Sequence, residues 1–123
     1  MERARRPEIP LALIGFALVF RLTLLPLVPV ASDDIYRYLW DGRVSLAGIN
    51  PFAYAPIDPR LAHLTTPDLP ARINFPAMRT IYPPAAQLFF LVSNILFGPS
   101  IVGMKVLMVL ADAGTIVLLL LVL

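Results

Sequence analysis

The chain has 123 residues, 59% of them hydrophobic, with a mean hydropathy of +0.79 and a formal net charge of +2. An ordinary soluble domain is about 45–50% apolar, so this excess predicts a protein of the lipid bilayer. The small net charge gives little support to a nucleic-acid partner, and the absence of cysteine excludes disulfides, cysteine–zinc sites and thiol nucleophiles. One histidine, His63, cannot form a histidine-rich metal site.

The first predicted element is a transmembrane helix over residues 9–31, which follows a short cytoplasmic segment, residues 1–8. About 20 apolar residues are enough to cross the hydrocarbon core, and Pro7 and Pro10 lie where the start of a helix tolerates proline. A cleaved signal peptide is the alternative, but Arg21 interrupts the apolar stretch that such a signal requires.

The orientation of this helix follows from lysine and arginine, which are enriched on the cytoplasmic side of a membrane. Arg3, Arg5 and Arg6 precede the helix, so the N-terminus is expected in the cytoplasm and residues 32–80 outside the inner (plasma) membrane. This loop also holds five arginines, which conflicts with the rule. Its five aspartates do not remove the conflict, because the rule counts lysine and arginine only.

The loop over residues 32–80 is expected to be ordered, because aromatic and aliphatic residues run through it and disordered segments lack them. Its opening stretch, ASDDIYRYLWDGR, predicts a helix to about Ala47, with Ser32 as N-cap and Gly48 as a left-handed stop. The stretches DPRLAHL and PDLPARI each predict one or two amphipathic helical turns lying on the membrane surface.

Two further transmembrane helices are predicted, over residues 81–97 and 100–123. Pro83 and Pro84 suit the first turn of one helix, and Gly98 followed by Pro99 marks its end. The other helix stops within an apolar run, TIVLLLLVL, which indicates the N-terminal part of a longer protein; a complete small membrane protein is the alternative. The predicted fold is therefore an all-α, multi-pass membrane protein with three spans and a large extracytoplasmic loop containing interfacial helices.

Charged residues within these spans need partners, because each costs about 2.5–3.5 kcal/mol on insertion scales. Lys105 is expected to snorkel toward the cytoplasmic edge. Asp112 is expected to pair with another helix, and Arg21 to meet a lipid phosphate or to form an ion pair within the membrane. The amide and hydroxyl side chains of the second span are expected to join helices by hydrogen bonds; they are Gln87, Ser93 and Asn94.

One face of the loop helix carries Asp34, Arg37, Tyr38 and Asp41, at spacings of three, four and seven residues. Such residues cap and decorate any solvated helix, where each ion pair contributes only about 0.3–0.5 kcal/mol. The same carboxylates, beside a membrane, are also suited to act as a general base on a sugar hydroxyl. Both interpretations are compatible with the pattern.

A sugar carried on a polyprenyl phosphate already has a good leaving group, so its transfer needs a base and positive charge at the phosphate. Arginines bind phosphate by paired hydrogen bonds, and the candidates are Arg21, Arg37, Arg43 and Arg79. Aromatic faces such as Tyr36, Trp40 and Tyr54 can stack on a sugar ring, or they can act as interfacial anchors.

Three stretches together resemble the start of bacterial integral-membrane glycosyltransferases of the GT-C superfamily: SDDIYRYLWDGRVSLAGINPFAYAP, INFPAMRTIYPPAAQLFF and KVLMVLADAGTIVLLL. The closest likeness is to the mannosyltransferase-like branch that uses polyprenyl-phosphate sugars, and it covers roughly residues 20–120. An acidic motif after the first membrane helix supplies the catalytic base in that superfamily. It falls here on Asp33 and Asp34, with a slight preference for Asp33.

The resemblance implies transfer of a sugar, mannose in this branch, from a polyprenyl-phosphate donor to an extracytoplasmic lipid or glycan acceptor, with inversion. Members of the superfamily have many more membrane helices, so the resemblance does not imply that this chain is active alone. The expected catalytic residues are Asp33 and Asp34, and the expected substrate-binding residues are Arg21, Tyr36, Arg37, Trp40, Asp41, Arg43 and Tyr82.

Metal dependence stays open at this point. No metal-ligand set is predicted, although two adjacent carboxylates are the oxygen ligands that Mg²⁺ or Mn²⁺ takes. A lipid-phosphate leaving group does not demand a metal. The alternatives to an enzyme are a non-enzymatic accessory or transporter part, whose acidic helix is a docking surface, and an inactive truncated product.

Overall fold

The computed structural model describes residues 8–30 and 32–122, and within these ranges all regular secondary structure is helical. The elements are α1 (Glu8–Leu24), α2 (Asp34–Leu46), the 3₁₀ helix η1 (Pro59–Leu64), α3 (Pro84–Phe97) and α4 (Ile101–Val122). The prediction of an all-α fold is therefore confirmed for the described residues. The predicted cytoplasmic segment lies outside them apart from residue 8.

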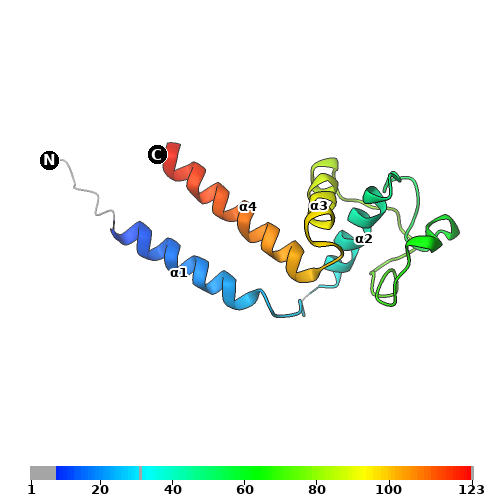
Figure 1. The fold of residues 1–123 in the computed structure, drawn as a ribbon, viewed down its shortest axis with the longest axis horizontal. Coiled ribbons are helices and arrows are strands. Elements are labelled where there is room, and N and C mark those ends of the chain that lie inside the picture. Colours follow the sequence, from blue (N-terminus) through cyan, green and yellow to red (C-terminus); the bar gives the residue numbers. More distant parts are fainter. Residues whose placement is uncertain (1–7, 31, 123) are drawn as a thin grey trace.

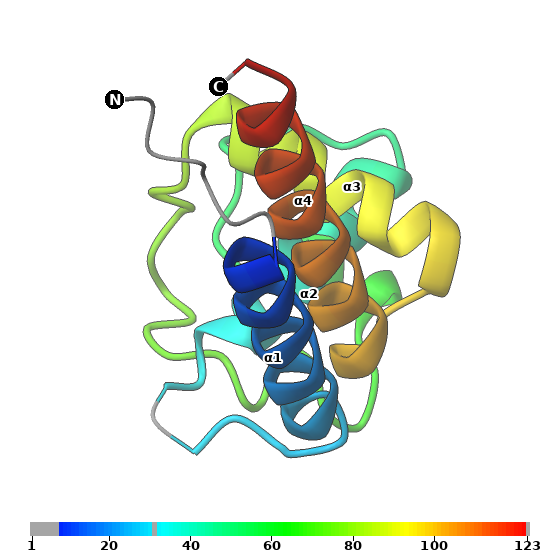
Figure 2. The same cartoon turned by 90° about the vertical axis from the view of Figure 1, so that its left-hand side faces the viewer.

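The long apolar helices and the rest of the chain occupy opposite ends of the structure. Helices α1 and α4 run antiparallel and side by side, while α2, α3 and η1 gather where α1 ends and α4 begins (Figures 1 and 2). Two polar contacts connect the antiparallel pair. Arg21 of α1 forms an ion pair with Asp112 of α4. The Lys105 ammonium donates to the carbonyl of Leu24, the last residue of α1, and to that of Leu27 just beyond it.

These contacts resolve two of the alternatives for charged residues in apolar helices. Asp112 pairs with another helix, as predicted, and its partner is Arg21. Lys105 does not lie at the predicted cytoplasmic edge: its ammonium caps backbone carbonyls at the C-terminal end of α1, opposite the predicted cytoplasmic N-terminus, where the helix dipole favours a cation. Each charge is therefore balanced by a contact between α1 and the α4 side of the chain.

Only α4, among the described residues, is long and apolar enough to cross a membrane. Its 22 residues give about 33 Å at 1.5 Å per residue, which exceeds a hydrocarbon core of about 30 Å. Helices α1 and α3 are apolar but have 17 and 14 residues, about 25 and 21 Å. The sequence predicts three spans, and the described residues show one helix of sufficient length.

Local signals set the helix ends close to where the sequence predicts them. Helix α2 ends at Leu46 and is followed by Gly48 in the left-handed region, with φ of 77°. Helix α3 begins at Pro84 and ends before Gly98, which has φ of 66°. The N-cap of α2 is one residue later than predicted: Asp33 occupies the cap position, while the Ser32 hydroxyl accepts from the Asp34 amide.

The core lies where α2 packs on α3, and η1, the following loop and the start of α4 complete it. Trp40 and Val44 of α2, Leu61 of η1 and Met104 of α4 are among its most buried side chains. Gly42 permits the close crossing of α2 and α3, because a Cβ there would overlap the Phe90 carbonyl and the amide of Asn94. The stretch DPRLAHL forms the predicted helical turn as η1, whereas PDLPARI forms turns only.

Candidate functional site

A pocket of about 190 Å³ lies between the start of α2 and the segment that leads into α3. Asp34 and Arg37 form its α2 wall, and an extended segment some forty residues later in the chain forms the opposite wall. The residues contributed by this later segment are Asn74, Phe75, Met78, Arg79, Ile81 and Tyr82. The pocket therefore combines one carboxylate and two guanidinium groups with an apolar rim.

The two adjacent aspartates of the acidic motif do not share this pocket. Asp34 lines it, whereas Asp33 is exposed at the N-cap of α2 and is not among the lining residues. Successive residues of a helix point about 100° apart, so only one of two neighbours faces a given wall. The sequence slightly favours Asp33 as the base, but the geometry favours Asp34.

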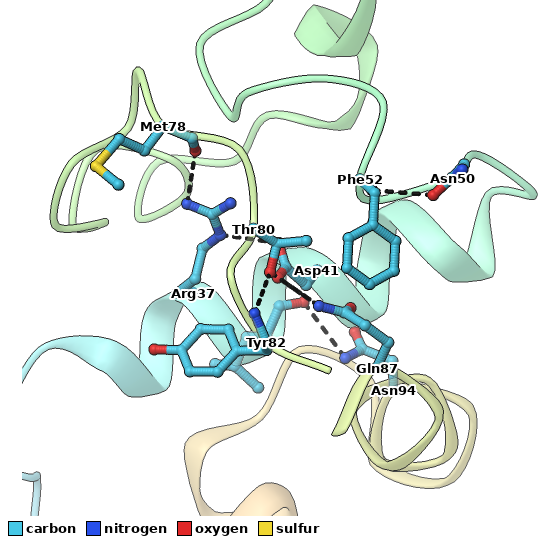
Figure 3. A network of polar contacts seen from close by, with 10 residues as sticks. Arg37, Asp41, Asn50, Phe52, Met78, Thr80, Tyr82, Gln87 and Asn94 are labelled. Carbon is cyan, nitrogen blue, oxygen red and sulfur yellow. Dashed lines mark hydrogen bonds and ion pairs between the residues drawn. The ribbon is translucent and has the colours of Figure 1, made fainter. Parts of the chain in front are cut away.

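Arg37 is the most constrained group of the pocket. Its side chain is only 8% exposed. Its Nε donates to Asp41 Oδ1 at 2.9 Å and its Nη1 donates to the Met78 carbonyl at 3.0 Å (Figure 3). The third nitrogen, Nη2, is buried and has no hydrogen-bond partner among the described residues. A buried charged donor without a partner costs free energy, so Arg37 is the group here most in need of an anionic acceptor.

Asp41 lies behind Arg37 and does not line the pocket. It is 2% exposed, and its second oxygen accepts a hydrogen bond from Gln87 Nε2 of α3 at 3.0 Å. The same Gln87 nitrogen donates to Thr80 Oγ1 at 2.9 Å. Asp41 was expected to bind substrate directly, but the structure commits both of its oxygens to protein groups (Figure 3).

Tyr82 closes the pocket on the α3 side. Its ring packs edge-on against Tyr38 and Phe90, at centroid distances of 5.0 and 5.7 Å. Burial, followed by the neighbouring Tyr38, raises the pKa of the Tyr82 hydroxyl well above its usual range. The hydroxyl is therefore neutral at all physiological pH values and can donate a hydrogen bond. Tyr82 was predicted to bind substrate, and the structure places it in the lining of this pocket.

Four of the residues predicted to bind substrate lie elsewhere. Trp40 is 1% exposed within the core and cannot stack on a sugar, and Arg43 Nε donates to the Leu64 carbonyl. Tyr36 is buried and its hydroxyl accepts from Arg72 at 2.7 Å. Arg21 pairs with Asp112 between α1 and α4 and does not line the pocket. Packing in the core buries Tyr36 and Trp40, which the sequence had left available to a ligand.

The sequence did not predict most of the pocket wall formed by residues 74–82, and Phe75 is the least expected of these residues. This residue has a positive φ of 53°, which is rare for a bulky side chain, and it is 73% exposed at the pocket. Strained backbone of this kind is concentrated at functional sites. No feature of the stretch NFPAMRT signals it, although Arg79 was a candidate phosphate ligand.

A second hollow, of about 310 Å³, lies on the other side of α2. Its walls come from α2, the loop after η1 and the start of α4: Tyr36, Leu39, Thr66, Pro67, Asp68, Leu69, Arg72, Pro99 and Ile101. It is larger, but it contains neither residue of the acidic motif. Residues 8–30 and 32–122 contain no group of three or more histidine, cysteine, aspartate or glutamate side chains arranged to hold a metal ion.

The comparisons with known proteins found no match to a family model, a curated protein or a solved structure. In the part of the chain that the structure describes, the fold is all-helical with one candidate membrane-spanning helix, and it forms a cationic pocket that holds a single carboxylate.

Proposed function

We propose that this chain is the N-terminal part of a membrane glycosyltransferase of the GT-C type. The reaction is transfer of a sugar, mannose by the sequence resemblance, from a polyprenyl-phosphate donor to an extracytoplasmic lipid or glycan acceptor. The observation that carries this proposal is the pocket itself. Asp34, from the acidic motif, shares it with Arg37, Arg79 and the neutral hydroxyl of Tyr82.

The chemistry assigns a role to each of these groups. The Asp34 carboxylate accepts the proton of an acceptor hydroxyl, and the oxygen attacks the anomeric carbon of the sugar. Attack from the face opposite the phosphate inverts that carbon, while the bond from carbon to phosphate oxygen breaks and the phosphate leaves with the electron pair. The guanidinium groups of Arg37 and Arg79 stabilise the negative charge on the departing phosphate.

The proposed membrane arrangement rests on the length of α4, on the antiparallel pairing of the apolar α1 with α4, and on the placement of the pocket. We assign α1 and α4 as an antiparallel pair within the inner membrane, with the N-terminus cytoplasmic and α2 and the pocket at the outer surface. The sequence predicts α3 as the second of three spans. Its length of about 21 Å and the burial of Gln87 and Asn94 against α2 favour a place in the extracytoplasmic part.

A transfer assay with labelled polyprenyl-phosphate mannose, on membranes carrying the protein encoded by the complete reading frame, tests this proposal. Asp34→Asn should lower the rate by about 10²- to 10⁴-fold, the usual contribution of a general base. Asp33→Asn, which changes the neighbouring carboxylate in the same way, should have a much smaller effect. Full activity in the variant lacking both carboxylates, at normal expression, would exclude the proposed function.

A further inference from the structure

Gln87 lies in the first turn of α3 and does not line the pocket, yet a continuous chain of hydrogen bonds connects it to the pocket wall. Its Nε2 donates to Asp41 Oδ2 at 3.0 Å, and Asp41 Oδ1 accepts from Arg37 Nε at 2.9 Å. Arg37 in turn lines the pocket, and Figure 3 shows its contact with Asp41. A side chain of α3 is thus two hydrogen bonds away from the candidate phosphate ligand.

We propose that Gln87 is a positioning residue, which acts through Asp41 to hold the Arg37 guanidinium where it binds the phosphate group of an anionic phosphate ester. This inference rests on the proposed function and deepens it by naming the anion ligand of the pocket and the group that fixes its orientation.

The hydrogen bonds of Arg37 explain why its orientation needs to be fixed. An arginine side chain loses considerable rotamer freedom when it is held, and a guanidinium binds phosphate well only when its planar fork is aligned. Asp41 and the Met78 carbonyl hold Nε and Nη1. The buried Nη2 has no partner among the described residues and remains a charged donor without an acceptor. Arg79 contributes a second positive charge to the same pocket.

Gln87 also ties the two walls of the pocket together. Its Nε2 bonds both to Asp41, on α2, and to the Thr80 hydroxyl at 2.9 Å, on the segment between Met78 and Tyr82. Without this amide, Asp41 keeps only its bond to Arg37, and the pair can turn together. The guanidinium is then tied to the opposite wall by its bond to the Met78 carbonyl alone, which fixes one of its nitrogens but not the plane of its fork.

Binding of two phosphate probes to the chain in nanodiscs tests the inference: inorganic phosphate and farnesyl phosphate, with uncharged farnesol as the control ligand. Gln87→Ala should weaken phosphate binding about 5- to 50-fold, the size usual for coupling between contacting residues, and leave farnesol unaffected. Asn94→Ala is the matched control, because Asn94 is an amide of the same helix that donates to the Leu39 carbonyl of α2 without touching Arg37 or Asp41. It should lower stability but leave phosphate affinity unchanged.

A paired exchange separates positioning from general damage to the fold. Gln87→Glu alone places two buried carboxylates against each other and should weaken binding. Adding Asp41→Asn restores one carboxylate and one amide to the contact, with an Asn oxygen still available to Arg37 Nε. The double variant should therefore recover most of the affinity that Gln87→Glu loses, which a purely structural role does not predict.

The outcomes discriminate clearly. Binding of farnesyl phosphate alone, if it depends on Gln87, identifies a carrier-borne phosphate, whereas comparable binding of inorganic phosphate identifies free phosphate as sufficient; either supports the inference. Absence of phosphate binding, or unchanged affinity in Gln87→Ala beside a loss of stability like that of Asn94→Ala, overturns it. If sugar transfer depends on Asp34 but phosphate binding does not depend on Gln87, this inference is rejected and the proposed function stands. If phosphate binding depends on Gln87 but sugar transfer does not depend on Asp34, the proposed function is rejected and this inference stands.

Discussion

Within the described residues, two arginine–aspartate ion pairs join residues four positions apart, one pair buried and one exposed, so the effect of burial can be tested with the same two side chains. Arg37 and Asp41 are joined at 2.9 Å, with side chains 8% and 2% exposed. Asp68 and Arg72 lie 3.7 Å apart, with side chains 70% and 57% exposed. We compare Asp41→Ala with Asp68→Ala, each of which deletes one carboxylate and leaves an arginine behind.

The expected losses of stability differ because the arginine left behind is buried in one variant and exposed to water in the other. Removing one partner of a buried ion pair costs about 3–5 kcal/mol, since an uncompensated charge stays in the interior. In Asp41→Ala, the Arg37 guanidinium keeps one hydrogen bond, to the Met78 carbonyl, and Gln87 loses an acceptor. An exposed pair contributes about 0–1 kcal/mol, so Asp68→Ala should change the free energy of unfolding by less than about 1 kcal/mol.

The single tryptophan provides the measurement. Trp40 is 1% exposed and sits next to Asp41 in the sequence, so its fluorescence reports unfolding of the domain that contains the pair. Urea titrations in detergent micelles give a midpoint and a slope, from which the free-energy difference follows. If both variants shift the free energy of unfolding equally, or if Asp41→Ala shifts it by less than about 1 kcal/mol, the argument from burial is wrong.

Three further predictions concern packing, electrostatics and topology. Gly42→Ala should destabilise the domain by about 1–3 kcal/mol in the same urea assay, because its Cβ meets backbone atoms of α3; a gain in stability from helix propensity alone would contradict the packing. Hydrogen bonds from the Arg60 side chain and amide lower the pKa of the Asp58 carboxyl to about 2, so its stabilising contribution should be present above about pH 4 and lost as the pH falls toward 2. An NMR titration should show this midpoint, and Arg60→Gln should return it toward the ordinary 3.9 or so; a midpoint that does not move would refute the pairing. Ile95→Cys, on the exposed face of α3, should react with an impermeant maleimide added outside intact cells, as Ile81→Cys should; reaction only after permeabilisation would mean that α3 spans the membrane.

The sequence could predict the features that depend on local backbone chemistry. Proline at the start of α3 and glycine after α2 and α3 place the helix ends within one or two residues, because proline fits a first helical turn and glycine adopts positive φ without strain. The high apolar fraction correctly indicated a chain with a helix suited to a bilayer. The cost of a charge in an apolar helix correctly indicated that Asp112 pairs with a neighbouring helix.

The tertiary structure alone decided the composition of the site. On a helical wheel, Trp40 and Asp41 are available to a ligand as readily as Asp34 is. Packing of α2 on α3 buries the first two and leaves Asp34 at the pocket. The opposite wall, including the strained Phe75, comes from a segment with no periodic pattern.

There is a physical reason why the sequence predicted the helix ends but not the residues of the pocket. Helix ends are set by the φ preferences and missing hydrogen bonds of residues close together in the chain, which the sequence displays directly. Access to a pocket depends on which side chains exclude water from which others. That is decided by contacts between residues such as Asp41 and Gln87, 46 positions apart, and no local pattern records such contacts.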